Sequence, residues 1–199
     1  MDIKPIMRIS RSSTLVLVAI VMISSCLVGE DSKMIVSFEY PESLNDWYSV
    51  NDGVMGGRSK GSFTSTSSGG LLFFGDLSLE NNGGFASIRS RMEPLNLSDA
   101  KGLLVRARGD GRTYTMNLWG PRMGTATSYR ASMPTNGGEI EEIFIPFSEF
   151  RLTSYGRLIR GQPLNTADIR SIGFTISDKN EGPFKLEILS IQAVLSGES

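Results

Sequence analysis

Three glycine-rich stretches of the sequence carry side chains that can bind a ligand through hydrogen bonds. Asp52 lies in "NDGVMGG", Asn82 lies in "ENNGG", and Asp110 and Arg112 lie in "GDGR". Carboxylates and carboxamides accept hydrogen bonds, and a guanidinium donates them in a fixed fork. Because loops at one end of a rigid scaffold commonly carry binding residues, we expect these four residues to form a common polar rim that contacts a ligand or a partner.

The glycines of the same stretches also have a structural interpretation. Glycine permits a positive φ and a close approach of the backbone, and asparagine and aspartate form local turns. We favour this shaping role for "NDGVMGG" and keep a ligand surface as the alternative. The loop-shaping glycines are predicted to be Gly53, Gly56, Gly57, Gly83 and Gly84.

Catalysis finds little support in the sequence. The chain contains no histidine, which removes the commonest general base and the commonest transition-metal ligand. No serine lies in a recognisable nucleophile elbow. Oxygen ligands from Glu39, Asp52, Asp178 or backbone carbonyls could hold a structural calcium ion. We therefore predict no catalytic residue and no cofactor, keep calcium as an option, and leave any other metal unassigned.

Length and charge limit the class of protein. A chain of 199 residues with 40% hydrophobic residues is large enough for one substantial core. Its 20 basic and 21 acidic residues nearly cancel, so no net field attracts nucleic acid or an anionic surface. We expect one domain and no nucleic-acid partner, and the oligomeric state stays open.

The amino terminus is typical of an export signal. Basic residues precede the short apolar run "LVLVAIVMI" at 15–23, which is followed by "ISSC" at 23–26. This tetrapeptide is similar to the bacterial lipobox, in which the cysteine is acylated and becomes the first mature residue. We predict a signal peptide over 1–25, lipidation at Cys26, a tether over 26–33 and a domain over 34–195. The alternatives are an ordinary cleavage site, which would release a secreted soluble protein, and an uncleaved anchor.

Strands must position the polar loops, because apolar residues recur with a period of two and no sustained helical period exists. Glycine-rich turns such as "ENNGG", "RGDG" and "NEGP" separate the strands. This pattern predicts an all-β fold, an antiparallel β-sandwich or jelly roll. The alternating residues cover 34–40, 71–79, 86–92, 103–107, 114–118, 129–133, 143–147, 172–176 and 184–188.

Several motifs together carry a family resemblance. The succession "VNDGVMGGRS", "LENNGGFASIRSR", "VRARGDGRTY", "IFIPFSEF", "YGR" and "SIGFTISDKNEGPFKLEI" resembles the complex I intermediate-associated protein 30 family over about 38–191. The resemblance implies a galactose-binding-like fold, which includes carbohydrate-binding modules. In mitochondria it implies a chaperone-like assembly factor. Two positions depart from the family pattern: Ile140 replaces a tryptophan and Met133 replaces a phenylalanine.

Three functions therefore stay open for the sequence. The favoured one is a non-catalytic, membrane-tethered binding domain that recognises a protein partner. The alternative is a carbohydrate-binding module for envelope or extracellular glycans, in which exposed aromatics such as Trp119 or Tyr155 would stack on sugar rings. A glycoside-active enzyme is the least favoured, because no pair of carboxylates stands out.

Overall fold

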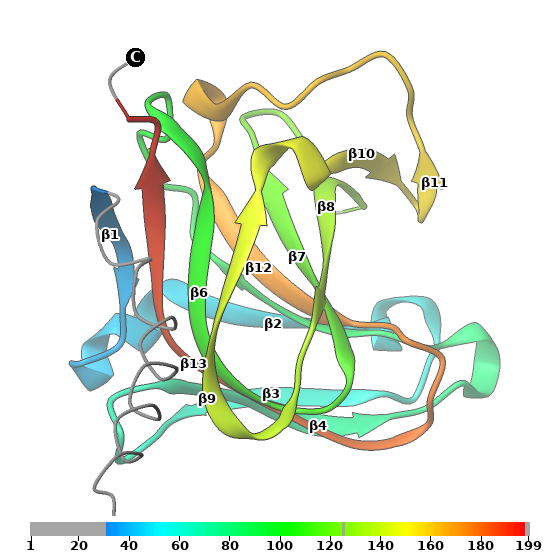
Figure 1. Ribbon diagram of the computed structural model, residues 1–199. Coiled ribbons are helices and arrows are strands. Elements are labelled where there is room, and N and C mark those ends of the chain that lie inside the picture. The colour runs from blue at the N-terminus through cyan, green and yellow to red at the C-terminus, as the bar shows by residue number, and fades with distance from the viewer. Residues whose placement is uncertain (1–30, 125, 198–199) are drawn as a thin grey trace, which may run out of the picture. The chain divides into compact units, whose positions relative to one another are not determined.

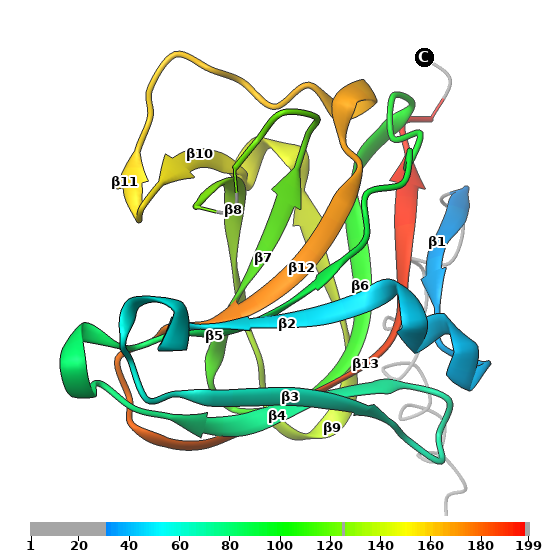
Figure 2. The same ribbon diagram turned by 180° about the vertical axis from the view of Figure 1, so that it is seen from behind.

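Two antiparallel sheets make up the fold in the computed structural model, which describes residues 31–124 and 126–197. The sheets pack face to face, as Figures 1 and 2 show from opposite sides. This arrangement confirms the predicted β-sandwich. The predicted signal peptide and Cys26 lie outside the described residues, and none of the helices in the described part has the length and hydropathy of a membrane-spanning helix.

One sheet has six strands. Five of them follow the order β3-β4-β13-β6-β9, and the sixth, β1, pairs with the carboxy-terminal half of β13. Every pair in this sheet is antiparallel. The strands are β1 (Ser32–Ser37), β3 (Lys60–Ser65), β4 (Leu71–Leu77), β6 (Ala100–Asp110), β9 (Gly137–Pro146) and β13 (Gly182–Leu195).

The other sheet has seven strands in the order β11-β10-β8-β7-β12-β5-β2. Short 3-10 helices connect strands of both sheets: η1 (Pro41–Asp46), η2 (Asp52–Met55), η3 (Glu80–Asn82), η4 (Phe147–Glu149) and η5 (Thr166–Asp168). The strands are β2 (Trp47–Asn51), β5 (Ala86–Ser90), β7 (Thr113–Trp119), β8 (Thr127–Pro134), β10 (Arg151–Ser154), β11 (Arg157–Leu158) and β12 (Ser171–Ile176).

The core lies between the two sheets and consists of the alternating apolar residues that the sequence indicates. Phe73 of β4 touches Tyr114 of β7 across the sandwich, with ring centroids 6.5 Å apart. Leu103 and Val105 of β6 and Ile172 and Phe174 of β12 are fully buried. Since successive side chains of a strand point to opposite faces, the residues between them form the outer faces of the two sheets.

The first and last strands extend beyond the predicted alternation. β1 begins at Ser32, inside the segment expected to be a tether, because Ser32 and Lys33 pair with Val194 and Ala193. β13 continues to Leu195, although its alternation is interrupted by a register shift between Ile188 and Ser190. Backbone hydrogen bonds between paired strands do not require apolar side chains, and they explain why β1 begins earlier and β13 continues further than the predicted strands.

Candidate functional site

Asp52, the first residue of the predicted polar rim, is a buried hydrogen-bond acceptor rather than a surface group. It is 0% exposed. Its carboxylate accepts hydrogen bonds from the Ser59 amide (2.9 Å), the Ser59 hydroxyl (2.5 Å) and the amides of Gly84 (2.7 Å) and Phe85 (3.2 Å). The carboxylate therefore ties the loop after β2 to the loop before β5, and this geometry favours the structural interpretation of "NDGVMGG".

Two glycines leave room for this carboxylate. A Cβ on Gly57 would collide with the Asp52 side chain, and a Cβ on Gly83 would lie 2.6 Å from Asp52 Oδ2. Gly56 ends η2 in the left-handed region at φ +89°, and Gly84 has a φ of +121°. Gly53 has neither constraint, because its φ is not positive and nothing lies within 4 Å of its added Cβ.

Arg112 is bound to the loop that joins β12 to β13. Its guanidinium pairs with both oxygens of Asp178, at 2.6 and 3.0 Å, and donates to the carbonyl oxygens of Asn180, Gly182 (3.3 Å) and Pro183 (2.9 Å). The two side chains of the ion pair are only 13% and 10% exposed. Arg112 therefore fixes this loop, which has no regular structure of its own.

Asp110 also has its partners inside the protein. Its carboxylate accepts from the Arg112 amide (3.1 Å), the Tyr114 hydroxyl (3.1 Å) and the Lys185 amide (2.8 Å). Burial, followed by the charge of Asp110 and its hydrogen bond, raises the pKa of Tyr114 far above its ordinary value. The Tyr114 hydroxyl therefore stays protonated and donates.

The predicted rim loops do approach one another at one end of the sandwich, through the β12–β13 loop. Arg112 binds that loop through Asp178 and Asn180. Glu181 of the same loop accepts a hydrogen bond from the amide of Leu79 (2.8 Å), which lies just before η3. Asn82 in η3 is exposed, has φ +58°, and bonds to none of the described residues through its side chain. Asn82 is thus the one rim residue with a free side chain, and a binding role for the rim stays a prediction.

The predicted calcium ligands do not come together. Glu39 is exposed, Asp52 is enclosed by its amide donors, and Asp178 pairs with Arg112. Within residues 31–124 and 126–197 no group of three or more His, Cys, Asp and Glu side chains could hold a metal ion. A site made of backbone carbonyls stays a prediction.

We expect these carboxylates to make stability depend on pH. Burial alone would raise the pKa of Asp52, but its hydrogen bonds from Ser59, Gly84 and Phe85 lower it overall. Burial alone would also raise the pKa of Asp178, but Arg112 and the hydrogen bonds from Asn180 together lower it. A carboxylate with a depressed folded pKa stabilises the fold above its unfolded pKa of about 4 and loses that contribution as the pH falls.

Urea midpoints measured between pH 7 and pH 3 should therefore be level down to about pH 5 and decrease below about pH 4. A midpoint that rises between pH 5 and pH 3 would contradict the depressed pKa values.

A second polar region, which the sequence did not single out, lies on the outer face of the seven-stranded sheet. Five outward residues are in register across neighbouring strands β2, β5, β12, β7 and β8. We call them the polar row: Tyr48, Arg89, Gly173, Asn117 and Arg130.

Several side chains of this face are buried although they point away from the core. Asn117 is 1% exposed and donates to Thr175 Oγ1 (3.0 Å), while Ser128 donates to Asn117 Oδ1 (3.3 Å). Arg130 Nε donates in turn to Ser128 Oγ (3.1 Å). A chain of hydrogen bonds thus runs along the face and holds these polar side chains in fixed positions.

Trp119 lies beside the polar row on β7. Its ring packs on Gly173, where an added Cβ would lie 2.9 Å from Trp119 Cζ3, and the Arg89 guanidinium lies 4.0 Å from its ring centroid. Trp119 Nε1 is buried and has no hydrogen-bond partner. Trp119 thus belongs to the outer face and not to the core cluster, and it leaves one buried donor unused.

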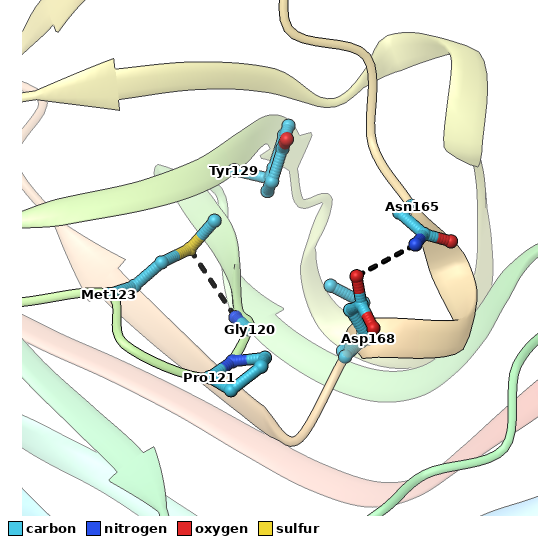
Figure 3. Close-up of a pocket in the computed structure, with 7 residues that line it drawn as sticks. Gly120, Pro121, Met123, Tyr129, Asn165 and Asp168 are labelled. Atoms are coloured by element: carbon cyan, nitrogen blue, oxygen red, sulfur yellow. Dashed lines mark hydrogen bonds between the residues drawn. The ribbon is translucent and has the colours of Figure 1, made fainter.

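A small pocket lies at the end of β7, next to Trp119 in sequence (Figure 3). Its volume is about 100 Å³, well below the roughly 300 Å³ at which drug-sized ligand sites begin. Asn165 and Asp168 bond to each other at 2.7 Å across its rim, and Gly120 donates to Met123 Sδ. The pocket is too small to enclose a ligand of that size, so recognition by an open face fits the geometry better.

Comparison with known proteins agrees with this architecture. Among solved structures, a family 11 carbohydrate-binding module from a cellulosomal cellulase of Clostridium thermocellum superposes with a TM-score of 0.63 at 18% identity, covering 85% of this chain and 98% of the module. A second structure of a family 11 module, in complex with a β-1,3-1,4-mixed-linked tetrasaccharide, gives a TM-score of 0.61 at 18% identity, with 84% and 98% covered. These similarities establish the fold.

Sequence relatives establish the family. The mitochondrial complex I intermediate-associated protein 30 of Mus musculus is 33% identical over 187 residues, which cover 81% of this chain and 56% of the relative. The Drosophila melanogaster protein of the same name is 29% identical over 189 residues, covering 79% and 61%. This chain thus spans little more than half the length of either relative. The family model described as complex I intermediate-associated protein 30 matches residues 36–188. The chain therefore belongs to the complex I intermediate-associated protein 30 family.

Proposed function

We propose that this chain is a non-catalytic binding domain that recognises another protein through the outer face of its seven-stranded sheet. The observation that carries the proposal is the polar row, in which Tyr48, 39% exposed, and the half-buried Arg130 lie at either end of the buried Arg89 and Asn117, all on the side away from the core. Hydrogen bonds within the face hold these side chains in fixed positions, as a preorganised recognition surface requires.

Family membership supports a protein as the partner. The mouse and fly relatives are named for association with intermediates of complex I. Because this chain matches only about half of each relative, we transfer the kind of function, which is assembly by binding, and not the identity of the assembled complex.

A glycan is the second candidate, and one observation favours it. Tyr48, at the end of the polar row, is 39% exposed and offers a ring for stacking on a sugar. Trp119, however, is covered by the Arg89 guanidinium, so its ring is not free to stack on a sugar. Tyr155, the other aromatic that the sequence predicts to stack on a sugar, is 80% exposed in the turn after β10. The polar row itself offers one exposed ring, Tyr48, and fits a protein partner better than a polysaccharide chain, along which several rings are stacked.

Purification of the full chain from crosslinked membranes, beside a screen of the same protein on neutral and acidic glycans, separates the two candidates. The proposal predicts a specific protein partner and no retained glycan. Retention of a glycan without a protein partner would establish the second candidate, and turnover of a glycoside would contradict both.

We further propose that the chain is exported and anchored by a lipid at Cys26, which lies outside the described residues. The short apolar run and "ISSC" support this location. Cys26→Ser should abolish incorporation of labelled fatty acid and release the protein from the membrane fraction. If the wild-type chain never incorporates the label, the anchor is wrong, and export as a soluble protein becomes the better account.

A further inference from the structure

Charge is distributed unequally between the two sheets. The seven strands of one sheet contain four arginines and neither aspartate nor glutamate. The six strands of the other contain six basic and six acidic residues. The net charge near zero of the whole chain therefore conceals one sheet whose strands carry only positive charges. Its arginines are Arg89, Arg130, Arg151 and Arg157, and the first three are in register on the outer face.

Two of these arginines, one buried and one half-buried, have no carboxylate partner among the described residues. Arg89 is 6% exposed, and its Nε donates to Ser171 Oγ (3.2 Å) while one terminal nitrogen reaches Met92 Sδ (3.8 Å). Arg130 is half-buried and bonds only to Ser128. Burial lowers the pKa of both guanidiniums. A guanidinium has five N–H donors, so each arginine has donors left for an acceptor.

Three other arginines of the described residues are paired with a carboxylate. Arg58 meets Glu80 (2.6 Å), Arg108 meets Glu187 (3.3 Å), and Arg112 meets Asp178. Buried charges in proteins are normally paired in this way, since desolvation of an unpaired charge is costly. The buried Arg89 departs from that rule, and the half-buried Arg130, in register with it on the same face, has no carboxylate partner among the described residues either. An acidic group of another molecule would supply the missing partner.

The spacing of the two arginines fits an extended peptide. Arg89 on β5 and Arg130 on β8 are in register, and the three strand spacings between β5 and β8 amount to about 14 Å. The Arg89 guanidinium extends over Trp119 of β7, toward Arg130. An extended segment rises about 3.4 Å per residue and turns alternate side chains to one side. Acidic residues two or four positions apart would therefore reach both guanidiniums.

We propose that the polar row binds an acidic, extended segment of the protein partner, with its carboxylates on Arg89 and Arg130. Each guanidinium presents parallel N–H donors that match a carboxylate. Asn117 lies between the two arginines in the row, and the exposed Arg151 continues the row onto β10. This inference rests on the proposed function and adds the chemistry of the bound segment.

The test titrates the full chain, in non-ionic detergent, with a labelled octapeptide of alternating threonine and glutamate, and with the same peptide carrying glutamine. The glutamate peptide should bind at least about tenfold more tightly, as expected for the loss of one charge-assisted hydrogen bond. Arg130→Gln should weaken glutamate-peptide binding by a similar factor, and Arg130→Lys by less. Arg106→Gln, on the outer face of the six-stranded sheet, is the matched control and should change nothing.

Arg130 is half-buried, so thermal melts of each variant must show that it is folded before affinities are compared. Equal affinity for the two peptides, or an equal loss in the Arg106→Gln control, would overturn the inference. Binding of oligogalacturonate, but not of the glutamate peptide, would also overturn the inference and identify an acidic glycan as the ligand. Binding of phosphatidylglycerol vesicles in place of the peptide would overturn it and identify a lipid surface. If Arg130→Gln crosslinks to the cellular partner as well as wild type does, only this inference fails. If no protein crosslinks to wild type, the proposed function fails.

Discussion

Asp52→Ala should lower the free energy of unfolding by about 3–5 kcal/mol, which corresponds to a fall of roughly 10 °C in Tm for a domain of this size. The substitution removes the acceptor of four hydrogen bonds, two of them from the amides of Gly84 and Phe85. A buried donor without an acceptor costs about 1–3 kcal/mol, and water entering the vacated space offsets part of the total. Thermal and urea unfolding measure the effect.

Asp46→Ala is the control, because Asp46 is exposed and its side chain bonds to none of the described residues. Its effect should lie within about 0.5 kcal/mol. Gly57→Val should destabilise the protein as Asp52→Ala does, since its side chain would displace the carboxylate. If Asp52→Ala unfolds like wild type but binds its partner more weakly, Asp52 is a binding residue and its structural role is wrong.

Arg112→Ala should lower the free energy of unfolding by about 2–4 kcal/mol. The change leaves the Asp178 carboxylate, 10% exposed, without its cation. It also frees the carbonyl groups of Asn180 in the β12–β13 loop and of Gly182 and Pro183 at the start of β13. Because breaking a buried pair leaves an uncompensated charge, the loss exceeds that of a surface ion pair. Amide hydrogen exchange should also increase locally in residues 178–182.

Arg106→Ala provides the comparison for this prediction, because Arg106 is exposed and has no ion pair with the described residues. A loss of stability no larger than that of Arg106→Ala would mean that the β12–β13 loop does not depend on Arg112.

The sequence predicts the sandwich well because every second residue faces the core and is apolar along most of the long strands, which gives a clear period of two. Leu103, Val105 and Ala107 are separated by the outward residues Leu104 and Arg106, and all three are fully buried in β6. Short strands are harder to predict: β10 has four residues, and only Leu152 among them is buried and apolar. Met92, predicted as part of a strand, is 43% exposed and follows the end of β5.

The two departures from the family pattern occupy different environments. Met133 is fully buried, so it replaces a phenylalanine inside the core with a side chain of comparable size. Ile140, on β9, is 40% exposed. A tryptophan at that position would lie on the surface of the six-stranded sheet, so a contact that depends on it does not transfer to this chain.

The candidate site was harder to predict than the fold. The residue types place Asp52, Asp110 and Arg112 in polar turns. They do not reveal that each of these side chains finds its hydrogen-bond partners within the same chain. Arg89 shows the opposite error: it is an outward residue next to the core residue Ile88, as on any solvated strand, and it packs against Trp119 and Ser171, which are distant in sequence. The one available signal was the lack of acidic residues in the strands around it.

Site-specific photo-crosslinking tests most directly whether the outer face of the seven-stranded sheet binds the partner. Benzoylphenylalanine replaces Tyr48, 39% exposed on that face, or Phe144, 44% exposed on the outer face of the six-stranded sheet, in otherwise identical full chains. We expect irradiation of intact cells to give a discrete protein adduct from position 48 and none from position 144. An adduct from position 144 alone would contradict the account, because it would place the partner on the opposite sheet.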